Sequence, residues 1–398
     1  MARQQCIGIL GGTFDPVHRG HIGMGLGVLE AGWLDQLLVI PSGDPPHKSC
    51  AASAEDRWKM VVSACSLDKR LRPDRLELDR SGTIYAVDTL HALQEAYPGA
   101  SLYYLIGADT LLSLDRWHLW EEVLSLCTFI ICRREQEADD ASVAEAVRRY
   151  TALGGRFMSL PVSPFPVSST EIRRALAAGE QPAGLDVSVL EYCTVKGLYG
   201  TPGRLEHIDE WMEFLFSALK PKRFAHSLSV AFEAKRLARL HGIDCLKAEQ
   251  AGLLHDCAKC LPLKEMRRIA KDRSLTDDPK FLESDALLHS VVGASLAETL
   301  YGMKDPEVLE AIRYHNTGHK GMSRLAMCVC LADSIEPLRQ SYPLLEKIRA
   351  MAEQSLERAL LFSLESTADY VTSRGLFLHP RTRNTIRWLK SLPETAEN

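Results

Sequence analysis

Eleven residues near the start of the chain constrain its fold more than any other segment. They run from Gly11 to His21 and read Gly-Gly-Thr-Phe-Asp-Pro-Val-His-Arg-Gly-His. An apolar run over residues 6–10 precedes them and is short enough to be a buried strand. The two glycines allow a sharp turn and a close backbone approach to a ligand. Helical spacing of apolar residues over 28–33 follows, so the segment predicts a strand that hands over to a helix.

Two histidines lie where this predicted helix begins. His18 and His21 are three residues apart, so a helix would place both rings on one face. Gly20 between them removes a side chain that could block a ligand. Backbone N–H groups and the helix dipole favour an anion at such a position, and imidazoles can donate hydrogen bonds to it. The arrangement therefore predicts a polyphosphate site.

Strand-like and helical segments alternate through the first half of the chain. Further apolar runs lie at 37–40, 102–106, 127–132 and 157–160, and helical periods lie at 56–65, 87–96 and 141–152. Such alternation predicts an α/β domain with a parallel sheet and helices on both faces. Ligands of these sheets bind at the carboxyl ends of the strands, so functional residues are expected just after the apolar runs.

Several candidates follow the predicted strands. Lys48 and Arg57 are candidates for a triphosphate, although a lysine in a proline-rich loop is often only solvated. Asp109, after Gly107, can accept hydrogen bonds from ribose hydroxyls or can cap a helix. Trp117 can form a platform for a flat ring or can pack in the core.

A capping box marks another helix start in the first half. Ser168 with Glu171 three residues later gives the signature, and apolar positions follow. Arg173 then falls in the first turn, where the helix dipole disfavours a cation unless an anion is near. Arg173 is therefore a candidate phosphate ligand.

These motifs, in this order, resemble the nucleotidyltransferase superfamily and in particular bacterial nicotinate-nucleotide adenylyltransferases. The resemblance implies a Rossmann-like domain over residues 1–200. It implies transfer of AMP from ATP, with Mg²⁺, to nicotinate mononucleotide, which gives nicotinate adenine dinucleotide and pyrophosphate. The catalytic residues would be His18, His21, Lys48 and Arg173. The nucleotide- and substrate-binding residues would be Gly11, Gly12, Thr13, Phe14, Arg57, Tyr85, Asp88, Thr89, Gly107, Asp109, Trp117, Arg133, Ser169 and Thr170. Ile84 and Ala86 replace hydroxyl residues of the family, which leaves nicotinate and nicotinamide as alternatives.

A glycine-rich join and a helical second half follow. Residues 197–203 contain three glycines and a proline, which is typical of a linker. Helical patterns continue from there and predict an all-α bundle over residues 204–398. Histidines and aspartates scattered along these helices combine imidazole with carboxylate, which suits iron, manganese, cobalt or zinc better than calcium. The candidate metal ligands are His226, His255, Asp256, His289, His315 and Asp333. His289 is expected to open a helix, and His315 to follow the helical run 306–313.

The order of these residues resembles the HD-domain phosphohydrolases, and the surrounding motifs resemble the YqeK family. The resemblance implies symmetrical hydrolysis of diadenosine tetraphosphate, a dinucleoside polyphosphate, to two ADP at two divalent metals, with iron favoured. Asp256, bridging the metals, and Lys259 would be catalytic. The substrate-binding residues would be Arg223, Asn316, Thr317 and Gly318. Asn316 and Met327 stand where the family usually has threonine and often has lysine.

Composition indicates which kinds of partner the chain is expected to bind and in which cell compartment it is expected to work. A net charge of −5 gives no footprint for nucleic acid, and we expect no membrane partner because no apolar run could span a bilayer. Eleven scattered cysteines and a start without a signal peptide favour a reducing cytoplasm. An oligomer is possible. Two alternatives stay open for the second half: a regulatory nucleotide-binding module, or a hydrolase of another nucleotide such as a guanosine polyphosphate.

Overall fold

The computed structural model of the chain describes residues 4–43, 50–133, 141–161, 165–203 and 205–393. It consists of two compact units, Met1–Leu205 and Glu206–Asn398. Alternating segments give way to helical ones at residues 200–204 of the sequence, a few residues before this division. Among the described residues, no helix has both the length and the apolar character needed to cross a bilayer.

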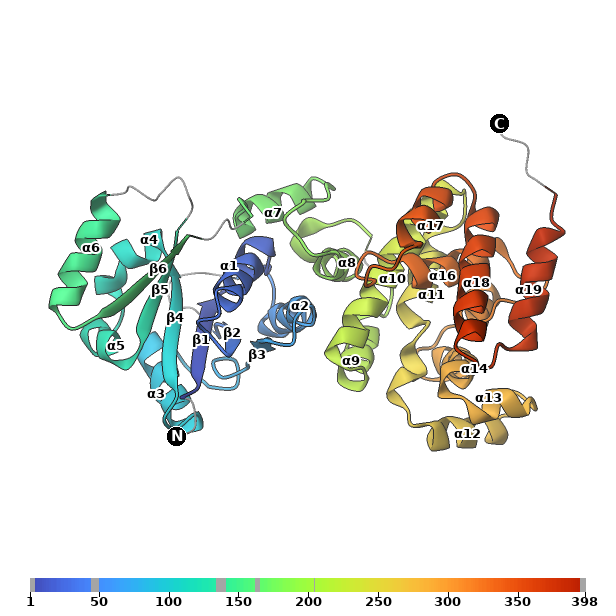
Figure 1. Ribbon diagram of the computed structural model, residues 1–398, viewed down its shortest axis with the longest axis horizontal. Helices are drawn as coiled ribbons and strands as arrows, with labels where there is room; N and C mark the ends of the chain where they lie inside the picture. Colours follow the sequence, from blue (N-terminus) through green and yellow to red (C-terminus); the bar gives the residue numbers. More distant parts are fainter. Residues whose placement is uncertain (1–3, 44–49, 134–140, 162–164, 204, 394–398) are drawn as a thin grey trace. The chain divides into compact units, whose positions relative to one another are not determined.

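A parallel sheet forms the centre of the first unit. Within the described residues it has six strands in the order β3-β2-β1-β4-β5-β6 (Figure 1). The strands are β1 (Cys6–Gly12), β2 (Gln36–Pro41), β3 (Leu71–Pro73), β4 (Ser101–Gly107), β5 (Thr128–Arg133) and β6 (Arg156–Pro161). The strand order reverses between β1 and β4, so a ligand crevice is expected outside the carboxyl ends of these two strands. The predicted α/β fold is confirmed, whereas β3, only three residues long, was not predicted.

Helices cover both faces of this sheet. Figure 1 shows α3 (Ala86–Ala96), α5 (Trp120–Leu126) and α6 (Ala141–Ala152) on one side, and α1 (Arg19–Glu30) and α2 (Ala54–Cys65) on the other. Alternate residues of β1 serve the two layers: Ile7 and Ile9 join the core under α3 and α5, while Gly8 faces Leu34 and Leu37. The unit also contains α4 (Ala108–Leu112), α7 (Ser169–Ala177) and α8 (Val187–Lys196).

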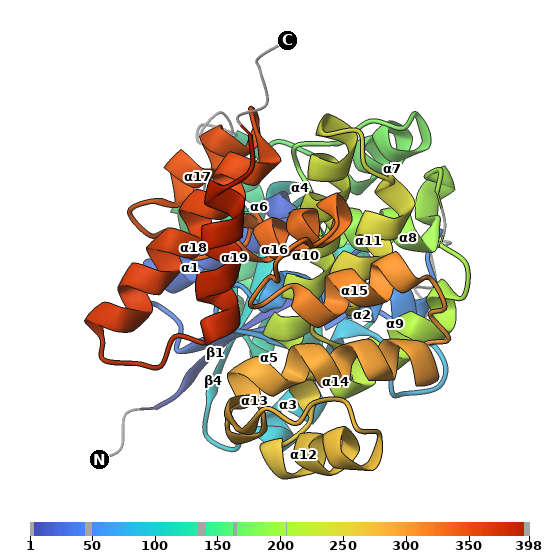
Figure 2. The ribbon, with the colours of Figure 1, turned by 90° about the vertical axis from the view of Figure 1, so that its right-hand side faces the viewer.

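The second unit is a helical bundle (Figure 2), as predicted. Its helices are α9 (Ile208–Ala218), α10 (Pro221–Leu240), α11 (Cys245–Leu254), α12 (Leu263–Asp272), α13 (Pro279–Glu283), α14 (Asp285–Thr299), α15 (Pro306–Tyr314), α16 (Arg324–Ile335), α17 (Leu345–Ala352), α18 (Leu356–Ser373) and α19 (Pro380–Lys390). Helix α10 packs on α11 and α16, and α14 packs on α15.

One predicted helix start is wrong. Helix α14 begins at Asp285, so His289 lies in its second turn and not at its start. Ser284 is the N-cap residue, and Asp285 provides the acidic group that the dipole favours in a first turn. By contrast, His315 does follow α15 directly, as predicted.

Candidate functional sites

The first candidate site lies where β1 hands over to α1. His18 is the N-cap residue of α1 and has an extended backbone. The rings of His18 and His21 stack with centroids 3.6 Å apart, and the His18 N–H donates to Nδ1 of His21 at 3.3 Å. The structure thus brings the two imidazoles together beside the first turn of the helix, where the helix dipole favours an anion.

Burial decides how His18 can act. The residue is 7% exposed, and its Nδ1 atom has no hydrogen-bond partner among the described residues. Loss of solvation on burial lowers the pKa of His18 to about 4. His18 is therefore neutral at pH 7 and offers hydrogen bonding and not positive charge.

Asp15, which the sequence analysis did not single out, holds this site together. Its buried carboxylate accepts hydrogen bonds from the N–H groups of Ala51 (2.7 Å) and Ala52 (3.1 Å) and from the Tyr199 hydroxyl (2.8 Å). Its backbone carbonyl accepts from Nη1 of Arg173 at 2.7 Å. Asp15, three residues before His18 in the chain, therefore holds Arg173 and anchors Ala51 and Ala52.

Helix α7 supports the same region. The capping box is present: Ser168 Oγ accepts from the Glu171 N–H at 3.2 Å, and Glu171 accepts from the Ser168 N–H at 2.9 Å. Ser169 donates to the Pro16 carbonyl at 3.1 Å, which ties the start of α7 to the first motif. Thr170 Oγ1 lies 3.4 Å from Nη2 of Arg173.

Arg57 makes backbone contacts that the sequence analysis did not predict. Its side chain is 1% exposed, and Nη1 donates to the carbonyls of Thr13 (2.8 Å) and Ser42 (2.7 Å). Nη2 donates to the Gly43 carbonyl at 2.9 Å. Through these carbonyls Arg57 joins the turns after β1 and β2. Contact with a triphosphate stays a prediction.

Aromatic side chains pack closely against the turn formed by Gly11 and Gly12. Phe14 is 1% exposed and has φ of 50°, so only its backbone can face a ligand. A Cβ atom on Gly12 would lie 3.2 Å from the Phe14 ring, and one on Gly11 would lie 2.5 Å from the Tyr104 hydroxyl. A side chain at Gly11 would therefore clash with Tyr104, and one at Gly12 would fit only tightly against Phe14.

Two residues that were predicted to line the pyridine site make hydrogen bonds to other residues of the chain. Thr89 is 1% exposed and donates to the buried Glu77 at 2.8 Å. Asp88 accepts from the Tyr85 N–H at 3.0 Å and so caps α3. These two side chains support the loop. Their contact with a ligand stays a prediction. Burial raises the pKa of Glu77 to about 7.

The other predicted residues lie at strand ends. Asp109 is exposed after β4, and its carboxylate folds over Gly107, where a Cβ atom would lie 2.6 Å from Oδ1. Trp117 is half-buried and packs edge-on against Tyr104, with centroids 5.5 Å apart. Arg133 ends β5, and its side chain lies outside the described part. Lys48 also lies outside the described residues.

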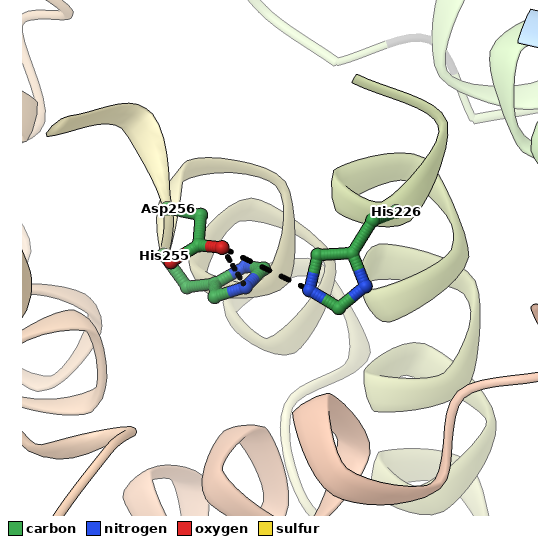
Figure 3. A group of neighbouring side chains, drawn as sticks. All are labelled: His226, His255 and Asp256. Carbon is green, nitrogen blue, oxygen red and sulfur yellow. Dashed lines mark ion pairs between the residues drawn. The ribbon is translucent and has the colours of Figure 1, made fainter. Parts of the chain in front are cut away.

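The second candidate site is a cluster of histidines and aspartates in the helical unit. We call His226 and His255 the first pair, and His289 and His315 the second pair. Oδ2 of Asp256 lies 3.8 and 3.5 Å from the Nε2 atoms of the first pair, as Figure 3 shows. Oδ1 lies 3.3 and 3.7 Å from the Nε2 atoms of the second pair. One carboxylate thus faces both pairs.

Asp333 closes the cluster on the side of the first pair. Its Oδ1 atom lies 3.1 Å from Nε2 of His226 and 3.9 Å from Nε2 of His255. Ligand atoms of three groups within the cluster lie within 4.8 Å of one another: His226, His255 and Asp256; His255, His315 and Asp333; Asp256, His289 and His315. These residues lie on or next to helices α10, α11, α14, α15 and α16, which pack against one another.

The cluster fits a divalent transition metal. Four imidazoles and two carboxylates are the donors that such ions prefer. His255 is fully buried, and its Nε2 atom makes no hydrogen bond with the described residues, which suits a metal ligand better than a structural histidine. Its Nδ1 atom faces the Gly252 carbonyl at 2.7 Å, so Nε2 is left for a ligand.

Charge is distributed unequally over the cluster. Burial alone would lower the pKa of His226, but Asp333, Glu336 and Asp256 outweigh it and raise that pKa to about 9. Burial, together with nearby His255 and His289, lowers the pKa of His315 to about 3. Burial opposes ionisation of Asp256, yet the surrounding imidazoles hold its pKa well below the usual range.

Groups predicted to bind phosphate surround the cluster. Arg223 lies on α10 and pairs with Oδ2 of Asp256 at 2.6 Å, with 41% of its side chain exposed. Lys259 is half-buried after α11. Asn316 donates to the Ala286 carbonyl at 2.7 Å, which ties the loop after His315 to α14. Thr317 is 1% exposed, and its hydroxyl donates to the Gly318 carbonyl at 3.0 Å.

Two family models match the chain. One, described as cytidylyltransferase-like, matches residues 9–175, and the other, the HD domain, matches residues 223–338. Together with the parallel sheet and the histidine–aspartate cluster, they define a nucleotidyltransferase domain followed by an HD domain.

Similar proteins identify the family further. A probable nicotinate-nucleotide adenylyltransferase from Pseudomonas syringae pv. tomato is 40% identical over 209 residues, which cover 49% of this chain and 94% of that protein. The chain therefore belongs, through its first unit, to the nicotinate-nucleotide adenylyltransferase family. A probable nicotinate-nucleotide adenylyltransferase/Ap4A hydrolase from Mycoplasma genitalium is 27% identical over 378 residues, 92% of this chain and 99% of that protein.

A solved structure is similar to one part of the chain. It is of a predicted HD superfamily hydrolase involved in NAD metabolism from Clostridium acetobutylicum. The sequence identity is 35%, the TM-score is 0.46, and the match covers 47% of this chain and 98% of that one.

Proposed function

We propose that the chain is a bifunctional enzyme of nucleotide metabolism. Its first unit transfers the adenylyl group of ATP to nicotinate mononucleotide and releases pyrophosphate. Its second unit hydrolyses diadenosine tetraphosphate to two ADP at a site for two divalent metals. Support for the pairing of activities comes from the M. genitalium relative, whose printed name joins an adenylyltransferase with an Ap4A hydrolase over nearly the whole length of this chain.

The stacked imidazoles of His18 and His21 carry the first proposal. In the reaction, an oxygen of the mononucleotide 5′-phosphate attacks the α-phosphorus of Mg²⁺-bound ATP, and the bond to pyrophosphate breaks. A phosphate nucleophile is already ionised at neutral pH, so the residues align two anions and need not remove a proton. His18 and His21 donate hydrogen bonds to phosphate, and Arg173 supplies positive charge beside them. We assign the ribose to Asp109 and the pyridine ring to Trp117.

A His18→Gln variant tests this proposal. We expect it to lower kcat/KM for dinucleotide formation about 100-fold, because the loss of one oriented donor costs that order of magnitude. The assay follows dinucleotide and pyrophosphate from MgATP and nicotinate mononucleotide, with nicotinamide mononucleotide in parallel. His91→Gln, an exposed histidine of the same unit, is the control. Unchanged activity in His18→Gln would contradict the proposal.

The position of Asp256 between the two pairs carries the second proposal. His226, His255, Asp256 and Asp333 would hold one metal, and His289, His315 and Asp256 the other. Bound divalent metals lower the pKa of a water and polarise phosphoryl oxygens. The chain's own cations, Lys259 and Arg223, would bind the phosphates of the tetraphosphate. The exposed part of the Arg223 side chain leaves it free to turn from Asp256 toward such a phosphate.

The second proposal is tested on the full chain after metal analysis. Incubation with diadenosine tetraphosphate should give two ADP by chromatography, and Asp256→Asn should give none. Asp272→Asn, an exposed carboxylate of the same unit that pairs with Arg268, is the control. Bound metal without ADP would point to another nucleotide, which a panel that includes guanosine polyphosphates identifies. Neither metal nor turnover would favour a regulatory module.

A further inference from the structure

The four histidines of the cluster differ in the group that contacts the Nδ1 atom of each ring. Three Nδ1 atoms face backbone carbonyls: His255 faces Gly252 at 2.7 Å, His289 faces Asp285 at 3.0 Å, and His315 faces Ile312 at 2.8 Å. His226 is different, because its Nδ1 atom faces Oε1 of Glu336 at 3.1 Å. One histidine of the first pair therefore has a carboxylate behind it.

Hydrogen bonds to both carboxylate oxygens hold the Glu336 side chain in place. It is 2% exposed, and its Oε2 atom accepts from Ser229 Oγ at 2.5 Å and from the Leu338 N–H at 2.6 Å. Arg349 donates to the Glu336 carbonyl at 2.8 Å, which fixes the backbone at this point. Ser229 lies one helical turn after His226 on α10, so the contact joins α10 to the end of α16.

One turn of α16 thus clamps the His226 ring. Asp333 lies 3.1 Å from Nε2, and Glu336, three residues later, lies 3.1 Å from Nδ1. A carboxylate at Nδ1 keeps a proton there, so Nε2, which faces Asp333 and Asp256, is the nitrogen that would give up its proton to a metal. A backbone carbonyl at Nδ1 gives the same tautomer, but it brings no negative charge toward a bound cation.

We propose that Glu336 is a positioning residue that fixes the tautomer of His226 and strengthens metal binding at the first pair selectively. The inference rests on the proposed metal-dependent function of the cluster. It makes the two metal positions unequal: the first pair holds its ion more tightly because the ring of His226 is oriented and made more basic by a buried carboxylate.

Glu336→Gln tests the inference sharply because of the donors at Oε2. Ser229 and Leu338 both donate to that position, so the amide oxygen of glutamine takes it and the NH2 group turns to Nδ1 of His226. His226 then has to accept at Nδ1 and carries its proton on Nε2, where it blocks a metal. The variant keeps the volume of the side chain and inverts the tautomer.

The measurement is Co²⁺ binding to the full chain by equilibrium dialysis, with visible absorption as a second signal. For wild type we expect two equivalents. Glu336→Gln should weaken one equivalent 10- to 100-fold and leave the other within twofold. Glu310→Gln is the matched control, because Glu310 pairs with His319 at 2.8 Å in the same unit outside the cluster. It should leave both equivalents unchanged.

Other results overturn the inference in distinguishable ways. Two unchanged equivalents in Glu336→Gln, or two equally weakened ones, would reject a selective role for Glu336 while leaving the metal-dependent function intact. A wild-type chain that takes up no Co²⁺ would reject both. If Glu336→Gln does not fold, Ser229→Ala removes one of the two donors that fix the carboxylate. It should weaken the same equivalent by a smaller factor, and an unchanged equivalent would contradict the inference.

Discussion

Burial gives His18 a protonation state that bears on the proposed phosphate site. With a pKa near 4, the ring is neutral over the physiological range, so in the proposed site an anion would meet oriented donors and not a fixed cation. The positive charge at the site comes instead from Arg173, which the Asp15 carbonyl holds in place. Hydrogen bonding and charge are thus supplied by different residues.

The same pKa predicts a pH dependence of stability. The folded pKa of His18 lies below the unfolded value near 6.5, so the unfolded chain binds more protons between these values. The free energy of unfolding should therefore fall as the pH drops from about 6.5 to 4, by up to about 3 kcal/mol from this group. Urea unfolding at pH 7.0, 5.5 and 4.5, followed by hydrogen exchange in peptides of β1 and α1, measures the effect.

His18→Gln isolates this contribution, because the variant has no titrating group at the position. Its unfolding free energy should change less with pH in this window than that of wild type, whereas His91→Gln should behave as wild type. If the unfolding free energies of wild type and His18→Gln change equally with pH, the pKa of His18 is not lowered in the folded chain.

Single residues also show which contacts could not be predicted from the sequence. The histidines and aspartates of both sites are recognisable because their chemistry and order are local. Asp15 and Glu336 lie inside motifs that are visible in the sequence, but their partners are far away: Ala52 is 37 residues from Asp15, and His226 is 110 residues from Glu336. The contacts of Arg57 escaped for the same reason, since its carbonyl partners become close only after the sheet has formed.

At the scale of elements, α19 braces the loop that follows His315. Thr385 on α19 donates to the Thr317 carbonyl at 3.3 Å. Gly318 has φ of 58°, and a Cβ atom there would lie 2.6 Å from Cγ2 of Thr385. A helix near the C-terminus therefore determines the position of a loop that borders the second pair.

Gly318→Ala should disturb this loop for two reasons, the left-handed backbone and the contact with Thr385. We expect a loss of about 2 kcal/mol or more in the free energy of unfolding of the second unit, measured by denaturant titration. Gly321→Ala is the matched control, because Gly321 has φ of 80° but nothing within 4 Å of a new Cβ atom. A smaller loss in Gly321→Ala, and partial recovery in Gly318→Ala with Thr385→Ser, would isolate the contact. Equal losses would contradict it.

Most helices and strands were predictable, because buried positions produce a local pattern of apolar residues in the sequence. Apolar runs of four to six residues gave the longer strands, and the periods at 87–96 and 141–152 lie within or coincide with α3 and α6. Strand β3 escaped because Leu71–Pro73 is too short for a period and ends in proline. The start of α14 was misplaced because its cap residues, Ser284 and Asp285, carry a weaker signal than the histidine motif.

At the scale of the whole molecule, each unit has its own core and its own candidate site. Ligands of one site should therefore protect one unit. We predict that MgATP slows hydrogen exchange in peptides of residues 4–205 only, and that EDTA speeds exchange in peptides of residues 206–393 only. Exchange with mass-spectrometric readout on the full chain measures both. Protection that spreads into the other unit would reveal coupling between the sites.

The hydrogen bond from Tyr199 to Asp15 joins residues 184 positions apart. During synthesis, the first motif leaves the ribosome long before its last support exists. The nucleotide site can therefore be completed only after Tyr199 has emerged, when translation of the helical unit is already under way. A nascent chain arrested before that residue should hold nucleotide poorly, although nearly all of the sheet has already been made.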